Sequence, residues 1–543
     1  MRAVTVPPKK GLFPLALPEE AVMPESHPVN SHLVWFVILY WVISVGIGLL
    51  AALRVKNTKD YAIAGRSLPL AMVTTTVFAT WFGSEAVLGI PASFLSGGLN
   101  GIVADPFGSS LCLILVGLFF AIPLYRMNLL TIGDYYKERY GRTVELVTSM
   151  CVVISYLGWV AAQITALGLV FNVVSGGEMT RETGMMIGAG SILLYTLLGG
   201  MWSVAVTDFV QMIIIVIGMI YIAFVVGSHA GGADVVLAKA SAEGKFQFFP
   251  AMNPKDLLAF IAASITLMLG SIPQQDVFQR VASSKNEQVA RNASILGGAA
   301  YFLFAFIPIF LAYSATIINP EMVQAWMKKD SQMILPNLVL QNVNVIAQVM
   351  FFGALLSAIK SCASATLLAP SVTFAENVIR PFFPKIKDKE YLHLMRVVVL
   401  LFTAFVTMFA MHSNSSIYEM VENAYKVTLV ATFAPLAFGL YWKRATNTGA
   451  LVSIALGLSS WIFMEALVAG TVWPFTEPSL PAVFQYLKST WPPELVGFLF
   501  AVTGMIVGSL FSEPHPEPLT HHHAHTYGER RKHHHAHHNP MAH

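Results

Sequence analysis

The stretch TTTVFATWFGSEAVLGIPASFLSGG, residues 74–98, is apolar enough to cross a membrane but carries glycines and Pro91 inside it. A second stretch, ITLMLGSIPQQDVFQR at 265–280, is interrupted in the same way by a glycine and Pro273. Because proline removes a backbone donor and clashes with the preceding turn, it bends or breaks a helix. Both stretches are therefore predicted to be membrane helices that are interrupted near their middle.

The composition places the whole chain in the membrane class. Of its 543 residues, 55% are hydrophobic and only 12% are charged, and the mean hydropathy is +0.63. Soluble proteins carry about 25% charged residues. Apolar runs of roughly 20 residues recur along the chain, and each can cross a hydrocarbon core about 30 Å thick. The sequence thus predicts an all-α membrane protein rather than a set of soluble domains.

About thirteen membrane-crossing helices are predicted from these runs. They cover residues 33–53, 68–96, 104–125, 144–175, 183–199, 206–229, 256–276, 292–317, 344–378, 392–412, 417–441, 447–469 and 490–511. The two interrupted helices are the second and the seventh. Interrupted helices at corresponding positions of two halves indicate an inverted-repeat transporter with its binding site at the breaks.

The distribution of lysine and arginine predicts the orientation. With the N-terminus outside, eighteen of these residues fall on inner loops and ten on outer segments. Basic residues concentrate on the cytoplasmic side of membrane proteins. We therefore expect a multi-pass protein of the cytoplasmic membrane, with the N-terminus outside and the C-terminus in the cytoplasm.

Six stretches together resemble the sodium:solute symporter family. They are YAIAGRSLP (61–69), LLTIGDYYKERYG (129–141), LLYTLLGGMWSVAVTDFVQ (193–211), LGSIPQQDVFQRVASSKN (269–286), GALLSAIKSCASATLLAPSVTFAENV (353–378) and SIYEMVENAYKVTLVATFAPLAFGLYWKR (416–444). The resemblance covers roughly residues 33–445. Within the family, the spacing of FATWFG, DPFGSSLCLILVGLFFA and IPQQDVFQRV looks nearest to the high-affinity choline transporter branch.

The resemblance implies a leucine-transporter-type fold, which consists of two inverted five-helix repeats. The repeats would be residues 68–229 and 256–441. The rest would be an external N-terminal segment (1–32), an extra transmembrane helix (33–53), two additional transmembrane helices (447–511) and a histidine-rich cytoplasmic tail (512–543).

The resemblance also implies a site for the coupling sodium ion between the first and eighth core helices. Its donors would be the carbonyls of Ala79, Phe82 and Ala358 and the side chains of Ser361, Cys362 and Asp208. Positions 358, 361 and 362 lie three and four residues apart, which places them on one face of a helix.

Two features of this chain depart from that pattern. Cys362 stands where the family usually has serine or threonine, and sulfur is a poor ligand for a hard cation. Lys360 lies in SAIKSCASA (357–365), where a charged amine at bilayer depth is costly and tends to be functional. It is expected to pair with Asp208 or, as a second candidate, with Glu85; alternatively, its amine reaches the interface at the helix end. Proton coupling through Lys360 therefore stays open beside sodium coupling.

The substrate site implied by the resemblance lies at the same breaks. Trp81 and Trp159 match two aromatic residues of the choline branch, which binds a quaternary ammonium by cation–π attraction. Ser109 and Gln274 stand where that branch has further aromatics. This exchange argues against choline and favours a smaller or more polar solute, such as an amino acid or an amine, with Gln163 and Gln274 as hydrogen-bonding groups.

The C-terminal tail repeats the sequence HHHAH. Histidine-rich tracts can bind metal weakly and without fixed geometry, although a disordered tail is the simpler interpretation. The candidate metal ligands are His521, His522, His523, His533, His534 and His535.

The sequence thus predicts a secondary active transporter that carries a small organic solute with a coupling cation by alternating access. The alternative is a solute sensor on the same scaffold. No ATP-binding loop, catalytic triad or metal cluster is visible, so we expect neither an enzyme nor a bound cofactor. The expected partners are the solute, Na⁺ or H⁺ and the lipid bilayer, with no nucleic acid.

Overall fold

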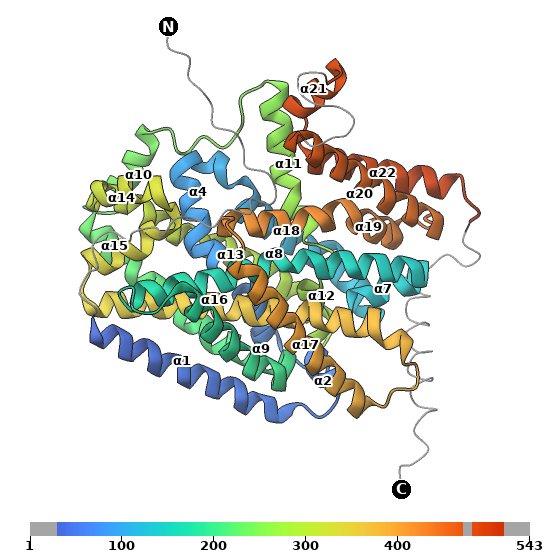
Figure 1. Ribbon diagram of the computed structural model, residues 1–543, viewed down its shortest axis with the longest axis horizontal. Helices are drawn as coiled ribbons and strands as arrows, with labels where there is room; N and C mark the ends of the chain where they lie inside the picture. Colours follow the sequence, from blue (N-terminus) through green and yellow to red (C-terminus); the bar gives the residue numbers. More distant parts are fainter. Residues whose placement is uncertain (1–29, 471–479, 515–543) are drawn as a thin grey trace.

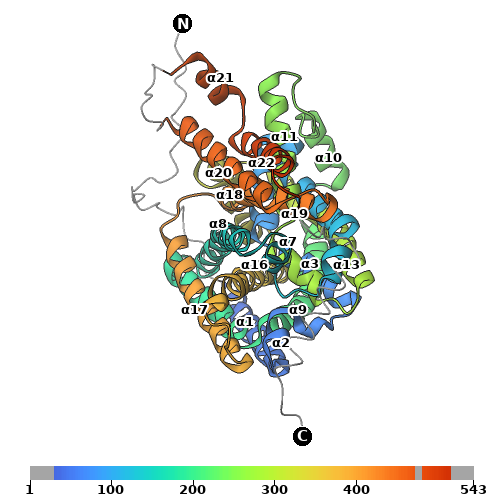
Figure 2. The same ribbon diagram turned by 90° about the vertical axis from the view of Figure 1, so that its right-hand side faces the viewer.

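The computed structural model describes residues 30–470 and 480–514, and these ranges are helical apart from the connections and one isolated β-bridge, Leu68 to Ser284 (Figures 1 and 2). A bilayer favours helices because each backbone donor finds its acceptor within the same segment. The predicted all-α class is therefore confirmed.

The first half of the chain begins with a peripheral helix, α1 Ser31–Ala51, and the short α2 Thr58–Ile63. Its main helices are α3 Leu70–Trp81, α4 Ile90–Gly97, α5 Ser109–Leu115, α6 Ala121–Arg126, α7 Ile132–Tyr140, α8 Arg142–Val174 and α9 Arg181–His229. Asn and Thr side chains start several of these helices. At α7, Thr131 and Asp134 form a reciprocal capping box.

The second half follows the short α10 Ala233–Ala242. It comprises α11 Pro254–Gly270, α12 Gln275–Ser283, α13 Glu287–Ile318, α14 Pro320–Lys329, α15 Ile334–Asn342, α16 Val345–Phe374, α17 Asp388–Met411, α18 Ile417–Ala431 and α19 Phe433–Tyr441. The chain then adds α20 Asn447–Ala469, α21 Ala482–Thr490 and α22 Pro493–Leu510.

Both predicted interruptions are present. The first helix stops at Trp81 and resumes as a short π-helical turn, η3 Glu85–Gly89, which leads directly into α4. The second lies between α11 and α12, whose axes differ by 42°. A comparable bend of 47° separates α18 from α19.

Fewer helices are long and apolar enough to cross a membrane than the thirteen that the sequence predicts. The described residues contain nine helices that could cross a membrane, or up to eleven if each bent pair is one span. One reason is α9, where the predicted spans 183–199 and 206–229 run together through a kink at Gly200. The figure of thirteen therefore stays a prediction.

The helices that carry the predicted site lie in the middle of the molecule. The α3 helix packs against α9, α13 and α16, and α8 packs against α16 and α18. Helix α1 lies along one edge beside α9 and α16, whereas α20 and α22 lie at the opposite side (Figures 1 and 2). The additional helices thus flank the core and leave both breaks inside it.

Candidate functional site

The first break is held open by a glutamine from α8. Phe82 leaves the helix with φ −85° and ψ 72°. The amide of Ser84 then donates to Oε1 of Gln163 at 2.9 Å instead of bonding four residues back to Thr80. Because the glutamine replaces a backbone acceptor, the Ser84 amide remains satisfied although it is buried.

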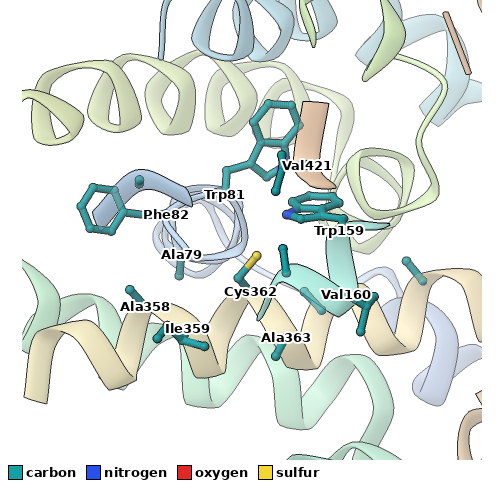
Figure 3. Close-up of a cluster of buried hydrophobic side chains, with 14 of the residues drawn as sticks. Ala79, Trp81, Phe82, Trp159, Val160, Ala358, Ile359, Cys362, Ala363 and Val421 are labelled. Carbon is teal, nitrogen blue, oxygen red and sulfur yellow. The ribbon is translucent and has the colours of Figure 1, made fainter. Parts of the chain in front are cut away.

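The predicted cation-site residues come from the two helices that meet at this break, α3 and α16. Ala79 and Phe82 lie at the end of α3, and Ala358, Ser361 and Cys362 lie on α16; all five are fully buried. Ala79 points toward α16 near Ala358, and Cys362 points toward the end of α3 (Figure 3). The structure therefore brings Ala79, Ala358 and Cys362 to the interface of α3 and α16, and the role of the five residues in ion binding stays a prediction.

Gly83 brings the unwound segment directly against α16. A methyl group added at this position would lie 2.7 Å from Cβ and 2.8 Å from Sγ of Cys362, and 2.8 Å from Oε1 of Gln163. Such contacts are shorter than van der Waals packing allows, so only glycine fits without movement. The thiol of Cys362 is thus part of the wall that faces the break.

Asp208 approaches the same region from α9. Oδ2 of Asp208 accepts a hydrogen bond from the Thr76 hydroxyl at 2.6 Å. Gln211, one turn further along α9, is hydrogen-bonded to the hydroxyl of Ser361. The carboxylate is therefore next to α3, and its helix contacts the α16 face that carries Ser361.

Lys360 points in another direction, toward the peripheral helix α1. Its amine donates to the hydroxyl of Ser44 and lies 5.2 Å from the centre of the Trp41 ring. The ring centre of Tyr195 on α9 lies 5.0 Å away on a second side. Two aromatic faces and a hydroxyl thus surround the buried ammonium, an arrangement that stabilises a cation without a carboxylate.

The expected ion pair of Lys360 is wrong. In the described part of the chain, neither Asp208 nor Glu85 lies within ion-pair distance of the amine, and both carboxylates have other partners. The reason is helical geometry. Successive residues of a helix are about 100° apart, so position 360 projects away from the face that holds 358, 361 and 362.

Five aromatic rings gather beside the break. The Trp81 and Trp159 rings meet edge to face at 6.1 Å (Figure 3). Tyr301 lies 6.4 Å from Trp81, Tyr425 lies 5.4 Å from Trp159, and Tyr156 stacks on Trp159 at 5.9 Å. These residues, here called the aromatic box, come from α3, α8, α13 and α18.

The second break contributes polar groups to the side of this box. Nε2 of Gln274 donates to Ser155 at 3.1 Å and to Thr428 at 3.2 Å. Two residues later, Asp276 accepts the indole N–H of Trp81 at 2.9 Å. Gln274 is therefore close to the aromatic box, but its side-chain amide is already hydrogen-bonded to residues of α8 and α18.

Two further carboxylates, Glu85 and Asp105, are bonded to residues near the box. Gln163 donates from Nε2 to Oε2 of Glu85 at 2.7 Å. Asp105 accepts from the hydroxyl of Ser109 at 2.6 Å and from that of Tyr301 at 2.5 Å. The side chains of Ser109 and Gln163 are thus hydrogen-bonded to these carboxylates. The hydroxyl of Tyr301 links Asp105 to the aromatic box.

Several residues of this region were not assigned to the site from the sequence. They are Asp105, Tyr156, Asp276, Tyr301 and Tyr425. They come from five separate helical segments and form no local motif. Their polarity is the sequence signal that could have identified them, because an acidic or hydroxyl group inside an apolar span needs a hydrogen-bond or charge partner.

The tail histidines lie outside the described residues. Among residues 30–470 and 480–514, no group of three or more histidine, cysteine or acidic side chains could hold a metal ion.

Comparison with known proteins agrees with this geometry. The model of the sodium:solute symporter family matches residues 61–457, which is most of the chain and includes both breaks, α9 and α16. The chain belongs to the sodium:solute symporter family. It is therefore a multi-pass membrane transporter and not an enzyme, and the family couples the movement of a small solute to that of sodium.

The relatives of this symporter include transporters that are named for two different solutes, choline and proline. The high affinity choline transporter 1 of Homo sapiens is 28% identical over 439 residues, covering 78% of this chain and 75% of that protein. The high-affinity proline transporter PutP of Bacillus subtilis (strain 168) is 26% identical over 430 residues, covering 76% and 88%. The predicted resemblance to the family and its choline branch is confirmed.

Solved structures support the fold of the symporter. A Na⁺-coupled sialic acid symporter in a substrate-bound outward-open state aligns with TM-score 0.73 at 16% identity, covering 91% of this chain and 100% of that one. MhsT in complex with L-phenylalanine aligns with TM-score 0.50 at 14% identity, covering 81% and 98%. These structural alignments confirm the leucine-transporter-type fold.

Proposed function

We propose that this symporter imports a small polar organic solute, such as an amino acid or an amine, across the cytoplasmic membrane by alternating access. The observation that carries the proposal is the meeting of two broken helices with the α16 face. Interrupted helices supply free backbone groups and dipole ends in the middle of the membrane, where a solute and its coupling ion can bind. The N-terminus would lie outside and the C-terminus in the cytoplasm.

Sodium is the coupling ion that the site favours. The carbonyls of Ala79, Phe82 and Ala358 and the hydroxyl of Ser361 are oxygen donors, which suit a hard cation. The amine of Lys360 would compete with an ion only if it faced these donors, and it faces α1 instead. We therefore favour sodium over proton coupling.

Uptake by the purified protein in proteoliposomes tests this proposal. A labelled amino acid or amine should accumulate above its equilibrium level when an inward sodium gradient is imposed, and should stop accumulating when the gradient is collapsed. Uptake is then measured against sodium at fixed pH, and against pH without sodium. Accumulation driven by a pH gradient in the absence of sodium would contradict sodium coupling. Binding without accumulation would favour the sensor.

A further inference from the structure

One buried carboxylate holds two members of the aromatic box. Asp276 lies in the first turn of α12 and is fully buried. Its Oδ2 accepts the indole N–H of Trp81 at 2.9 Å, and its Oδ1 accepts a hydrogen bond from the hydroxyl of Tyr156. The same hydroxyl accepts the main-chain amide of Asp276 at 2.7 Å. Three hydrogen bonds thus join one residue of the second break to two rings of the box.

Trp159 is held by neighbouring rings rather than by a hydrogen bond. Its indole N–H is buried and has no hydrogen-bond partner within the described part of the chain. Its ring is stacked on that of Tyr156 at 5.9 Å, meets Trp81 edge to face at 6.1 Å and lies 5.4 Å from Tyr425 (Figure 3). Asp276 holds the first two of these neighbours, so the orientation of Trp159 depends on this carboxylate as well.

A second tie between the same helices supports the arrangement. Arg280 lies four residues beyond Asp276, on the same face of α12. Its guanidinium donates to the carbonyl of Asp276 at 3.3 Å and to the hydroxyl of Thr80 at 2.9 Å. Thr80 directly precedes Trp81 in α3. The α12 helix is therefore tied to the end of α3 at two consecutive residues, which keeps the carboxylate beside the Trp81 indole.

The loss of the carboxylate would not be made good by water. Hydrogen bonds to a charged acceptor are shorter and stronger than those between neutral groups. Trp81 and Tyr156 are only 4% and 1% exposed. Without Asp276, each would keep a buried donor that lacks an acceptor, which is costly. Both rings would then be free to turn toward another acceptor.

Asp276 and the rings that it holds come from different halves of the chain. Trp81 lies on α3 and Tyr156 on α8, whereas Asp276 lies on α12, beyond the second break. The box therefore keeps its shape only while the start of α12 remains against α3 and α8. A movement of α12 away from them would release both tryptophans together.

We propose that Asp276 is a positioning residue for the solute: it orients Trp81 directly and Trp159 through Tyr156, and thereby gives the aromatic box the shape that binds. The carboxylate acts through these rings, because each of its oxygens is already bonded to one of them. This inference rests on the proposed transport function and deepens it, since it names the residue that shapes the solute site.

Fluorine NMR of the purified protein labelled with 5-fluorotryptophan tests the orientation without any solute. The two resonances are assigned by their loss in Trp81→Phe and in Trp159→Phe. Asp276→Asn should shift both, because the amide offers one acceptor oxygen where the carboxylate offers two. Tyr156→Phe keeps the ring, loses the hydroxyl and should shift the Trp159 resonance. An unshifted Trp81 or Trp159 in Asp276→Asn overturns the proposal, and an unshifted Trp159 in Tyr156→Phe overturns the route through Tyr156.

Glu376 supplies a matched control outside the box. It is 4% exposed, its carboxylate is hydrogen-bonded to the hydroxyl of Tyr391, and Arg380, four residues further on, pairs with it at 2.9 Å. Glu376→Gln therefore removes a buried carboxylate with the same kinds of partner. It should leave both fluorine resonances in place. Shifts as large as those of Asp276→Asn would indicate a general loss of packing and overturn the proposal.

Solute binding is measured with choline and L-proline, for which two of the relatives are named, by thermal stabilisation of the protein in detergent. The affinity for a probe that binds wild type should fall about tenfold or more in Asp276→Asn, and should be unchanged in Glu376→Gln. Asp276→Asn combined with Tyr156→Phe should lose less than the two single losses together, because both changes remove the same hydrogen bond. Fully additive losses, or wild-type affinity in Asp276→Asn, overturn the proposal.

Uptake separates this inference from the transport proposal. Sodium-driven uptake of a probe with wild-type KM in Asp276→Asn would overturn the inference and leave transport standing. Shifted resonances and weakened binding in that variant, without sodium-driven accumulation by wild type, would overturn transport and leave the positioning role standing. If neither probe binds wild type, the fluorine spectra decide the positioning role alone.

Discussion

Three consecutive residues of α16 have three different surroundings. Lys360 faces Trp41 on α1, Ser361 is hydrogen-bonded to Gln211 on α9, and Cys362 packs against the break of the first core helix. A rotation of about 100° per residue separates these directions. Substitutions at neighbouring positions should therefore affect different properties of the protein.

Cys362→Ser should strengthen sodium dependence. The hydroxyl is smaller than the thiol, so it fits against Gly83, and oxygen is a better sodium ligand than sulfur. The sodium concentration for half-maximal uptake is expected to fall several-fold in proteoliposomes. Cys151→Ser on α8 is the control and should behave as wild type. An unchanged or higher sodium requirement in Cys362→Ser would place the ion elsewhere.

Lys360→Met should leave sodium dependence unchanged, because the amine does not face the predicted ion donors. The unfolding temperature should hold or rise, since an apolar side chain of similar length replaces a buried charge that has no carboxylate partner. Sodium titration of uptake and thermal unfolding check the two expectations. A large change in sodium dependence would show that the amine acts on the ion site.

At the scale of elements, the first core helix depends on its break. Gln163 holds the Ser84 amide and Gly83 allows α16 to approach, so the unwinding and the contact each depend on a single residue. The second break, between α11 and α12, brings Gln274 and Asp276 to the aromatic box. The two interruptions together position the polar groups of the site.

Gly83→Ala should impair the contact between the first break and α16. The added methyl group would lie 2.7 Å from Cβ of Cys362, which neither backbone can avoid without moving. We expect a loss of about 1–3 kcal/mol of stability, the usual range for overpacking, together with slower uptake. Gly97→Ala is the control because nothing lies within 4 Å of its added methyl group. Equal thermal unfolding of the two variants would contradict the tight contact.

At the scale of the whole molecule, the core is flanked by helices on two sides. Helix α1 covers α9 and α16, whereas α20 and α22 pack against each other and against α18 (Figure 2). Lys360 ties α1 to the core through a cation–π contact. The peripheral helix is thus joined to the same helix that carries the predicted ion site.

The predicted topology places the two ends of the chain on opposite sides of the membrane. Cysteines introduced by Thr5→Cys and His525→Cys should react with an impermeant maleimide from outside and from inside, respectively. The three native cysteines are buried, so they should contribute little background. Labelling of both sites from one side of intact cells would contradict the odd number of spans.

The sequence alone determined the membrane class, the family and the location of both breaks. These follow from hydropathy and from glycine and proline, whose effects act within a few residues of the chain. Only the tertiary structure decided that Lys360 faces α1 and that Tyr301, Asp105 and Glu85 gather beside Trp81. Ser44 and Lys360, for example, are 316 residues apart in the sequence and are in contact because α1 and α16 meet in the folded core. Side-chain direction across packed helices depends on how each helix is rotated, and no local pattern in the sequence encodes that rotation.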